Sequence, residues 1–513
     1  MRSVRVLKNV LTNYARFFLG GLLGIVITPI MVHLLGDHDY GLWVTVFSLT
    51  GYFGLFDQGI RPSLVRYVSR DHARGDSEGL ERTVNTALAL FGAVGVVALA
   101  VTAVVASNFT RWFHIDAASI ATVTKVVWIA GVAVALGFPL GVFGAVLSGL
   151  QRYDLGNGIG IGVAIARALL FVAVLRLGGG LVALAWASLA MNLAGHALSF
   201  VLAQRLLPGI RYGWRYVTRA HLGLIGGYSS VSFVGALANS ITFQTDALVI
   251  TAILGAALVT PFAIASGLVD NVRSLVYSAT FVLAPTASEL ETRGETEKLH
   301  ALLIAGAKYS VLLSWPVLFG LLMFGENFLV TWVGEHYRSA FPLLLTLTVP
   351  TLLSLPQATA GALLFGVSRH KGMVALSLAN ALLNLGLSIA LARPLGLLGV
   401  ALGTALPLAL VGGVATLVYA CRALAMPLGT YLLHGIAQPG LVTLAFVLPA
   451  LALRAWWNPM GWVPIALACA GCWLCFAACA WRYGISRPER ERWGRMVPGL
   501  FGRGVAAAPA REA

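Results

Sequence analysis

The sequence predicts an all-α polytopic membrane protein with about fourteen transmembrane helices. Its composition is the first observation, because 58% of the 513 residues are hydrophobic and only 11% are charged. Soluble globular domains carry about 25% charged residues, so a large soluble domain is excluded. The second observation is an uneven distribution of lysine and arginine, and the third is an internal repeat.

Windows of about 20 mostly apolar residues recur along the whole chain and give the expected spans. The first apolar stretch runs from about Leu11 to Leu35 behind a positively charged N-terminus. It is longer than the apolar region of about 7–15 residues in a signal peptide, so we expect an uncleaved transmembrane helix. The last two spans are expected at 431–453 and 460–482, and the number is twelve instead of fourteen if these two segments do not cross.

Lysine and arginine concentrate in alternate connections between the expected spans. Of the 35 cationic residues, 25 fall on the side of the N-terminus, 6 fall on the other side, and 4 fall within spans. Because cytoplasmic loops are enriched in these residues, both ends of the chain are expected in the cytoplasm. The net charge of +15 is therefore attributed to cytoplasmic loops, and no nucleic-acid partner is expected.

Four ordered pairs of similar segments indicate a duplication. "LLG" at 34–36 and "ARGDSEGLE" at 73–81 recur 219 residues later as "ILG" and "TRGETEKLH". "GAVLSGLQR" and "LRLGGGLVALA" recur 217 residues later as "GALLFGVSR" and "ARPLGLLGVAL". Six spans separate the copies, so the halves share one orientation, as in transporters built from parallel repeats around a central cavity. We expect a six-helix lobe at 1–220, a second at 221–425, two additional helices at 426–484, and a basic cytoplasmic tail at 485–513.

One stretch carries a family resemblance. "PIMVHLLGDHDYGLWVTVFSL" followed by "GYFGLFDQGIRPSLVRYVSRDHARGD" is similar to the polysaccharide-transporter branch of the multidrug/oligosaccharidyl-lipid/polysaccharide exporter superfamily. This branch includes the flippases for O-antigen and exopolysaccharide repeat units. The resemblance covers nearly the whole chain in span number, repeat and loop pattern, and it is sharpest at 29–76.

The resemblance implies a multi-pass flippase of the bacterial inner membrane. Its implied cargo is an undecaprenyl-diphosphate-linked oligosaccharide, moved to the periplasmic leaflet by alternating access of the two lobes. Membrane lipids and other membrane proteins of polysaccharide assembly are implied as further partners. An ion gradient is the usual driving force in the superfamily, and the identity of the ion stays open.

Enzyme chemistry is not indicated by any motif, because the sequence has no GxxxxGK[ST], GxSxG or HExxH pattern. We therefore expect a transporter without catalytic residues, cofactor or metal. Two alternatives remain: a cation-coupled drug exporter of the same superfamily, and a membrane glycosyltransferase or polymerase. Four cysteines near one stripe of the last span are interpreted as small buried hydrophobes, in preference to a metal or redox site: Cys469, Cys472, Cys475 and Cys479.

Cationic residues within or beside spans are the candidates for substrate binding. Ionisable groups at this depth are costly and are expected to face a cavity, a partner or water. Arginine can hold a diphosphate through two hydrogen bonds, whereas snorkelling to the membrane surface is the alternative for Arg16 and Lys308. The candidates are Arg16, Arg61, Arg167, Arg273 and Lys308.

Three carboxylates, Asp57, Asp246 and Asp270, are the candidates for gating or ion coupling. Asp57 precedes Arg61 by four residues and Asp270 precedes Arg273 by three, so each acid shares a helix face with an arginine. A structural ion pair is the alternative interpretation for each of these two pairs. Asp246 lies deep in the seventh span, where a carboxylate is either paired or protonatable. A mildly positive cavity of this kind suits a diphosphate-linked, often acidic glycan.

Overall fold

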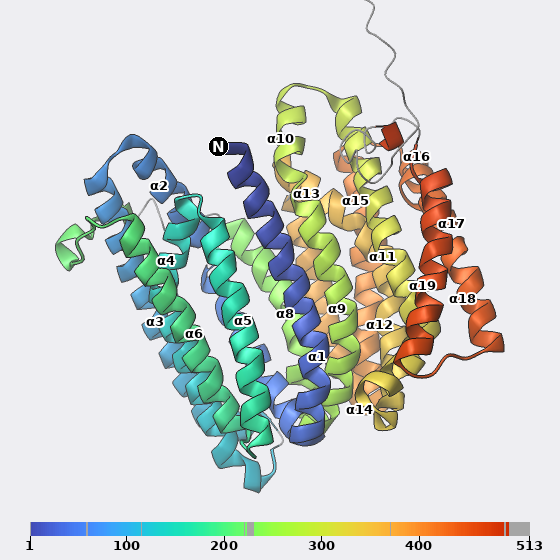
Figure 1. The fold of residues 1–513 in the computed structure, drawn as a ribbon, viewed down its shortest axis with the longest axis horizontal. Helices are drawn as coiled ribbons and strands as arrows, with labels where there is room; N and C mark the ends of the chain where they lie inside the picture. The colour runs from blue at the N-terminus through green and yellow to red at the C-terminus, as the bar shows by residue number, and fades with distance from the viewer. Residues whose placement is uncertain are drawn as a thin grey trace, which may run out of the picture.

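The computed structural model describes residues 2–57, 60–113, 115–219, 221–222, 230–369, 371–486 and 489–491. Within these ranges all regular elements are helical, which confirms the all-α class. Figure 1 shows long helices side by side in one slab, with the early helices at one side and the late helices at the other.

The first lobe contains the following helices: α1 (Arg2–Gly51), η1 (Tyr52–Asp57), α2 (Ile60–Arg74), α3 (Ser77–Trp112), η2 (Ala117–Ser119), α4 (Ile120–Gly149), α5 (Tyr153–Arg176), α6 (Leu181–Leu206) and η3 (Trp214–Tyr216). The second lobe contains these: α8 (Ser230–Ile253), η4 (Ala256–Leu258), α9 (Val259–Phe281), α10 (Ala284–Thr292), α11 (Thr296–Val333), η5 (Glu335–Ala340), α12 (Phe341–Ser354), η6 (Leu355–Gln357), α13 (Ala358–Gly366), α14 (Lys371–Pro407), η7 (Leu408–Ala415) and α15 (Thr416–Ala423). The remaining elements are α16 (Leu428–Tyr431), η8 (Leu432–Ala437), α17 (Gln438–Val442), α18 (Leu444–Trp456), α19 (Trp462–Cys479) and η9 (Ala480–Gly484).

Eleven helical segments of the described chain are long and apolar enough to cross a membrane. Two of them, Ala15–Asp57 and Lys371–Ala423, are interrupted by non-helical backbone at Gly36 and Gly396. Counting each as two spans, and adding α9, gives fourteen crossing helices in the described residues. The predicted number of about fourteen is therefore confirmed.

The reversal inside α14 is demonstrated by a contact between its two halves. The side-chain amide of Asn384 donates a hydrogen bond of 2.8 Å to the hydroxyl of Thr404, 20 residues later. In a straight helix these residues would be about 30 Å apart. The chain therefore folds back at Gly396, and α14 is a helical hairpin.

The two lobes repeat the same backbone turns, which confirms the duplication. Residues with left-handed backbone recur in pairs: Gly36 with Gly255 (φ 77° and 100°), Gly75 with Gly294 (φ 66° and 68°), and Gln151 with Ser368 (φ 58° and 57°). Positive φ is uncommon outside glycine, so its recurrence at Gln151 and Ser368 is informative. All three pairs lie in the matched sequence segments, and their offsets are those of the sequence repeat.

Close helix packing within the lobes depends on small residues. In a bilayer, helices gain little by removing apolar surface from lipid, so their association depends on van der Waals contact at short range. At Gly95 of α3 an added Cβ would lie 2.5 Å from the carbonyl oxygen of Ala135 in α4. At Gly131 of α4 it would lie 2.2 Å from the Thr102 side chain of α3. Larger residues at these glycines would force the two helices apart.

The helices beyond the second lobe pack on one side of it (Figure 1). Phe446 of α18 and Cys472 of α19 are buried against Phe324 of α11 in one apolar cluster. Figure 1 also shows the N-terminus, α2 and α10 at one end of the bundle, which we call the basic end. The turns at Gly36 and Gly255 each follow a span that starts from this end, so they lie at the opposite end, which we call the distal end.

Candidate functional site

The two lobes are joined at the distal end by Asp37, directly after the turn at Gly36. The Asp37 carboxylate lies 2.8 Å from His336 Nε2 and accepts a hydrogen bond from the Tyr337 hydroxyl. Its backbone carbonyl accepts a hydrogen bond of 2.6 Å from the hydroxyl of Thr260. One residue of the first lobe therefore contacts two separate elements of the second, η5 and α9.

Further contacts between the lobes continue from this end toward the middle of the bundle. The hydroxyls of Thr45 and Thr251 are 2.6 Å apart, and both residues are fully buried. Trp332 donates its indole N–H to the backbone carbonyl of Ile25 over 2.6 Å. An added Cβ at Gly41 would lie 1.9 Å from the backbone carbonyl oxygen of Ala256 in η4. The interface between the lobes is thus closed at the distal end.

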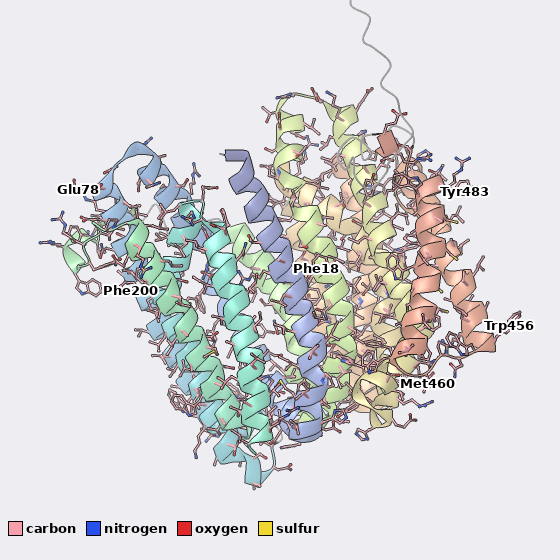
Figure 2. All side chains as sticks on the ribbon, in the orientation of Figure 1. Phe18, Glu78, Phe200, Trp456, Met460 and Tyr483 are labelled. Atoms are coloured by element: carbon pink, nitrogen blue, oxygen red, sulfur yellow. The ribbon has the colours of Figure 1, made fainter. Side chains whose placement is uncertain are left out.

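Nearer the basic end, a groove opens between α1 of the first lobe and α9 of the second. Its volume is about 700 Å³, and we call it the interlobe groove. It combines polar and apolar side chains: Asn13, Arg16, Phe18, Leu22, Asn271 and Ser274. Phe18 and Leu22 are 60% and 58% exposed, and Figure 2 shows Phe18 on the outer surface of α1. The groove therefore has a charged part and an apolar part that is open to surrounding lipid.

Arg16 is the cation of the interlobe groove. Among the described residues it forms no hydrogen bond and no ion pair. Its side chain lies over Gly160 of α5, where an added Cβ would be 2.9 Å from Arg16 Nε. Because glycine leaves this space, the guanidinium group is held beside α5 without being neutralised.

Arg167 follows Gly160 by seven residues on α5, so it returns to about the same helix face two turns further on. It is half-buried, and the described part of the chain gives it no acidic partner. The structure therefore places two predicted cations, Arg16 and Arg167, along the seam between α1 and α5 without counter-charges.

The predicted pair in the first lobe is an ion pair in the structure. Arg61 Nε lies 2.7 Å from Asp57 Oδ2, and the Arg61 side chain is 46% exposed. The pair faces α4, because an added Cβ at Gly141 would lie 3.2 Å from Arg61 Nη2 and 4.0 Å from His196 of α6. Asp57 and Arg61 thus lie inside the first lobe, and His196 is near them.

The predicted pair in the second lobe is also formed, but it is enclosed differently. Arg273 Nη1 lies 2.6 Å from Asp270 Oδ1. The arginine is only 9% exposed, and its guanidinium carbon lies 4.3 Å from the centre of the Phe243 ring. Arg273 is therefore neutralised by its neighbour and covered by an aromatic ring, whereas Arg16 is neither.

Asp246 of α8 is buried among uncharged donors. It is 6% exposed, accepts a hydrogen bond of 2.7 Å from Thr404, and lies 3.5 Å from the hydroxyl of Ser388. Asn384 donates to the same Thr404 hydroxyl over 2.8 Å. Within the described residues no cationic side chain bonds to Asp246. A buried carboxylate without a paired charge is costly, so this site favours uptake of a proton or a cation.

Lys308 lies away from the groove, in contact with the segment that follows α19 and η9. Its ammonium group is 2.7 Å from Glu489 Oε2 and 3.0 Å from Oε1, and Tyr309 donates to the same carboxylate over 3.1 Å. Burial raises the pKa of Glu489, but hydrogen bonds from Lys308 and Ser486 outweigh it and bring this pKa to about 2. The structure thus separates Lys308 from the other predicted cations.

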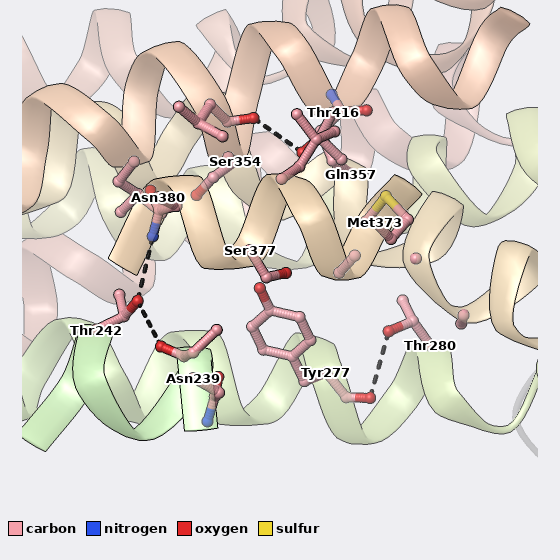
Figure 3. Close-up of a pocket in the computed structure, with 18 of the residues that line it drawn as sticks. Asn239, Thr242, Tyr277, Thr280, Ser354, Gln357, Met373, Ser377, Asn380 and Thr416 are labelled. Atoms are coloured by element: carbon pink, nitrogen blue, oxygen red, sulfur yellow. Dashed lines mark hydrogen bonds between the residues drawn. The ribbon is translucent and has the colours of Figure 1, made fainter. Parts of the chain in front are cut away.

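A second cavity, of about 530 Å³, lies within the second lobe and is shown in Figure 3. We call it the second-lobe pocket. The helices α8, α9, α12, α13, α14 and α15 surround it, with η6 and η7. Its polar lining consists of uncharged side chains: Asn239, Thr242, Tyr277, Thr280, Ser354, Gln357, Ser377, Asn380 and Thr416. The pocket has no distinct sequence signal, because its polar residues are uncharged and such residues are common in membrane spans.

The cysteines of α19 differ in their burial: Cys472 is buried as expected, Cys469 and Cys479 are half-buried, and Cys475 is exposed, so the expectation of four buried side chains is wrong for Cys475. The five cysteines are free thiols. In the described part of the chain, no group of three or more histidine, cysteine or acidic side chains could hold a metal ion. Cys472 is fully buried in the cluster with α11 and α18.

Comparisons with known proteins give one family and one fold. A family model described as "Polysaccharide biosynthesis protein" matches residues 30–342, which is more than half of the chain. The uncharacterized membrane protein EpsK of Bacillus subtilis (strain 168) is 25% identical over 346 residues, which cover 66% of this chain and 67% of that protein.

Two solved structures have the same arrangement of helices. The lipid II flippase MurJ, in an inward closed conformation, has a TM-score of 0.67 at 12% identity, covering 95% of this chain and 100% of that one. An inward-facing multidrug resistance MATE family transporter has a TM-score of 0.65 at 16% identity, covering 80% and 94% of the two chains. At these identities the likeness shows the fold alone, and it confirms the predicted fold class.

Proposed function

The chain belongs to the polysaccharide biosynthesis protein family, and we propose that it is a flippase for undecaprenyl-diphosphate-linked oligosaccharide repeat units in the bacterial inner membrane. The interlobe groove is the observation that carries this proposal. An amphiphile with an anionic head needs a cation beside a surface that is open to lipid. Arg16 supplies the cation, and the exposed side chains of Phe18 and Leu22 supply the apolar surface.

Alternating access follows from the uneven contact between the lobes. The distal end is closed by Asp37 and by tight packing around Thr45, whereas the interlobe groove lies nearer the basic end. The basic end faces the cytoplasm in this proposal, because cytoplasmic loops are rich in arginine and lysine. The carrier then enters the groove from the cytoplasmic leaflet, and transport requires the Asp37 contacts to break.

The predicted charges have separate roles in this proposal. Arg16 and Arg167, which have no acidic partner, bind the diphosphate. The pairs Asp57–Arg61 and Asp270–Arg273 exchange partners as the lobes move. Asp246 is the coupling carboxylate, because it is buried without a hydrogen-bonded cation among the described residues and lies where α8 contacts both arms of the α14 hairpin.

A drug exporter is the second candidate, and Asp246 is the observation that favours it. A buried acid suits the binding of a cationic drug or of a coupling cation, and the fold is similar to that of a MATE transporter. However, Asp246 is enclosed by Thr404 and Ser388. The open groove presents an arginine, which repels cations. We therefore rank export of cationic drugs below flipping of an anionic carrier.

Reconstitution into liposomes tests the proposal. Fluorescent undecaprenyl-diphosphate oligosaccharide is placed in both leaflets, and an impermeant reductant bleaches the outer pool. A flippase makes the inner pool accessible as well, so bleaching proceeds beyond half in protein-containing vesicles and stops near half in empty ones. If bleaching stops near half with the protein present, while a cationic dye accumulates along an imposed ion gradient, the drug exporter replaces the flippase.

A further inference from the structure

The second-lobe pocket has no role in the binding of the diphosphate, because no charged residue lines it. This is unusual for a polar cavity in a chain with a net charge of +15. Its volume of about 530 Å³ is within the range of about 300–1,000 Å³ for small-molecule sites. A pocket of this size that offers only neutral hydrogen-bonding groups is suited to a neutral, polar ligand.

The hydrogen-bonding capacity of the pocket is partly unused. Asn380 donates its amide N–H to the Thr242 hydroxyl over 3.2 Å, but its side-chain oxygen is buried without a partner, and the residue is 9% exposed. Gln357, which is 4% exposed, accepts a hydrogen bond of 3.1 Å from Tyr431. Buried polar groups are nearly always satisfied, so the unpaired Asn380 oxygen indicates a ligand that donates a hydrogen bond.

Aromatic rings form the other part of the wall. Tyr277 is 48% exposed, and Figure 3 shows its ring extending from α9 toward Ser377 of α14. Phe281 and Phe365 are 64% and 44% exposed, and their ring centres are 6.3 Å apart. They lie where α9 and α13 end, beside α10 at the basic end, so the pocket is approached from that end.

We propose that the second-lobe pocket binds uncharged sugar residues of the lipid-linked oligosaccharide, an inference that rests on the flippase function proposed above. Sugar hydroxyls can donate the hydrogen bond that the side-chain oxygen of Asn380 lacks, and they can also accept hydrogen bonds from the hydroxyl and amide groups of the lining. The C–H faces of a sugar ring pack against aromatic rings, which Tyr277 and the two phenylalanines provide. Uronic acids and other charged sugars bind less well, because no lining cation repays the desolvation of a carboxylate.

The pocket also lies one helical turn from Asp246, the proposed coupling carboxylate. Thr242 and Asp246 are four residues apart on α8, and Asn380 and Asn384 are four residues apart on α14, so each pair spans one helical turn. The Asn380–Thr242 hydrogen bond forms the floor of the pocket, and the Asn384–Thr404–Asp246 chain follows beneath it. Sugar binding and ion binding therefore act on the same two helices.

Protection of an introduced cysteine tests the proposal. Ser377→Cys places a thiol in the pocket, and Ser278→Cys, on the exposed side of α9 and outside the lining, is the matched control. Both are treated with a water-soluble maleimide, and peptide mass spectrometry separates the labelled position from the native cysteines. The probes are undecaprenyl diphosphate alone, the same carrier with three neutral hexose or N-acetylhexosamine residues, and the carrier with one of these replaced by a uronic acid.

The neutral glycan carrier is expected to slow labelling of Ser377→Cys by about ten-fold at ten times its dissociation constant. The sugar-free carrier leaves the rate unchanged, the uronic-acid carrier protects less, and none of the three affects Ser278→Cys. Tyr277→Ala, at an exposed position, is expected to remove most of the protection without loss of folded protein. Equal protection by the sugar-free carrier would overturn the inference, because lipid or diphosphate would then fill the pocket.

The outcome is separable from that of the proposed function. If vesicles flip the neutral glycan carrier but none of the carriers protects Ser377→Cys, the flippase stands and the sugar pocket is wrong. If the carrier protects Ser377→Cys but is not flipped, the pocket stands as a sugar site and the flippase proposal fails.

Discussion

The two lobes repeat one helical pattern but treat their charges differently. In the first lobe, Arg16 and Arg167 have no acidic partner among the described residues. In the second lobe, Arg273 is paired with Asp270 and covered by Phe243, and the free charge is instead the buried acid Asp246. The repeated fold therefore places an accessible cation in the first lobe, and a buried anion next to an uncharged pocket in the second lobe. In our account, this difference separates binding of the diphosphate from ion coupling and sugar recognition.

Loss of the open cation is expected to have the largest effect. Arg16→Ala removes a charged hydrogen-bonding partner of the diphosphate, which costs about 2 kcal/mol, or about 30-fold in flipping rate at limiting carrier. Arg16→Lys keeps the charge but loses the two-hydrogen-bond geometry, so an intermediate rate is expected. The rate is measured in proteoliposomes at several carrier concentrations.

Arg111→Ala is the matched control for this substitution, because Arg111 is exposed at the distal end of α3. Its flipping rate should equal that of the wild type. Equal rates for Arg16→Ala and the wild type would remove the distinction between the two lobes on which the account depends.

Loss of the buried anion should abolish the response to an ion gradient. Asp246→Asn keeps the shape of the side chain but removes its charge, so the gradient no longer acts on α8 and α14. Flipping under an imposed gradient is expected to fall about ten-fold, to the rate without a gradient. Ser388→Ala, which removes the weaker contact of 3.5 Å to Asp246 and a hydrogen bond of 3.4 Å to the Val400 carbonyl, should retain most of the response. An Asp246→Asn variant that still follows the gradient would assign coupling to another group.

Weakening the contact at the distal end should shift the balance between the closed and open arrangements of the two lobes. The effect is expected to be smaller than that of the two substitutions above. Tyr337→Phe removes one hydrogen bond to Asp37, which costs about 1 kcal/mol and shifts the balance of the two states about five-fold. Spin labels at exposed Leu34 and Ser339 report the separation of the lobes at this end, and a larger population of long distances is expected. Thr346→Ala, which removes a hydroxyl bonded only within α12, should leave the distances as they are in the wild type.

The smallest effect is expected at the contact between Lys308 and the C-terminal segment. Glu489→Gln removes the ion pair and should lower the free energy of unfolding by about 1 kcal/mol. The flipping rate should be unchanged. The pKa of Glu489 is about 2 in the folded protein, below its unfolded value of about 4.3. Its contribution is therefore complete above about pH 4.3 and is lost as the pH falls toward 2. Melting curves of the wild type and Glu489→Gln should differ at neutral pH and converge in acid.

Much of the fold could be predicted from the sequence, because membrane spans and repeats can be recognised from short segments of sequence. Matched segments such as those around Gly75 and Gly294 specify the same turn in both lobes, and the structure gives them nearly equal φ angles. The pairs Asp57–Arg61 and Asp270–Arg273 were also predictable, because residues three or four apart share a helix face.

The rest of the site depends on contacts between residues far apart in the chain. Asp37 meets His336 across 299 residues, and no local pattern specifies that meeting. The surroundings of Asp246 require the reversal at Gly396, which brings Asn384 to Thr404. The second-lobe pocket is lined by uncharged residues of eight elements, and such residues are too common in spans for their positions to stand out.

Photocrosslinking tests most directly whether the interlobe groove binds the lipid diphosphate and the second-lobe pocket binds the sugar. A photoreactive amino acid replaces Phe18 in the interlobe groove or Phe365 at the second-lobe pocket, and the carrier has separate labels on its sugar and its lipid. After crosslinking, mild acid cleaves the bond between sugar and diphosphate. We expect the protein to keep the lipid label at position 18 and the sugar label at position 365. Retention of the lipid label alone at both positions would contradict the account, because both sites would then bind the lipid part of the carrier.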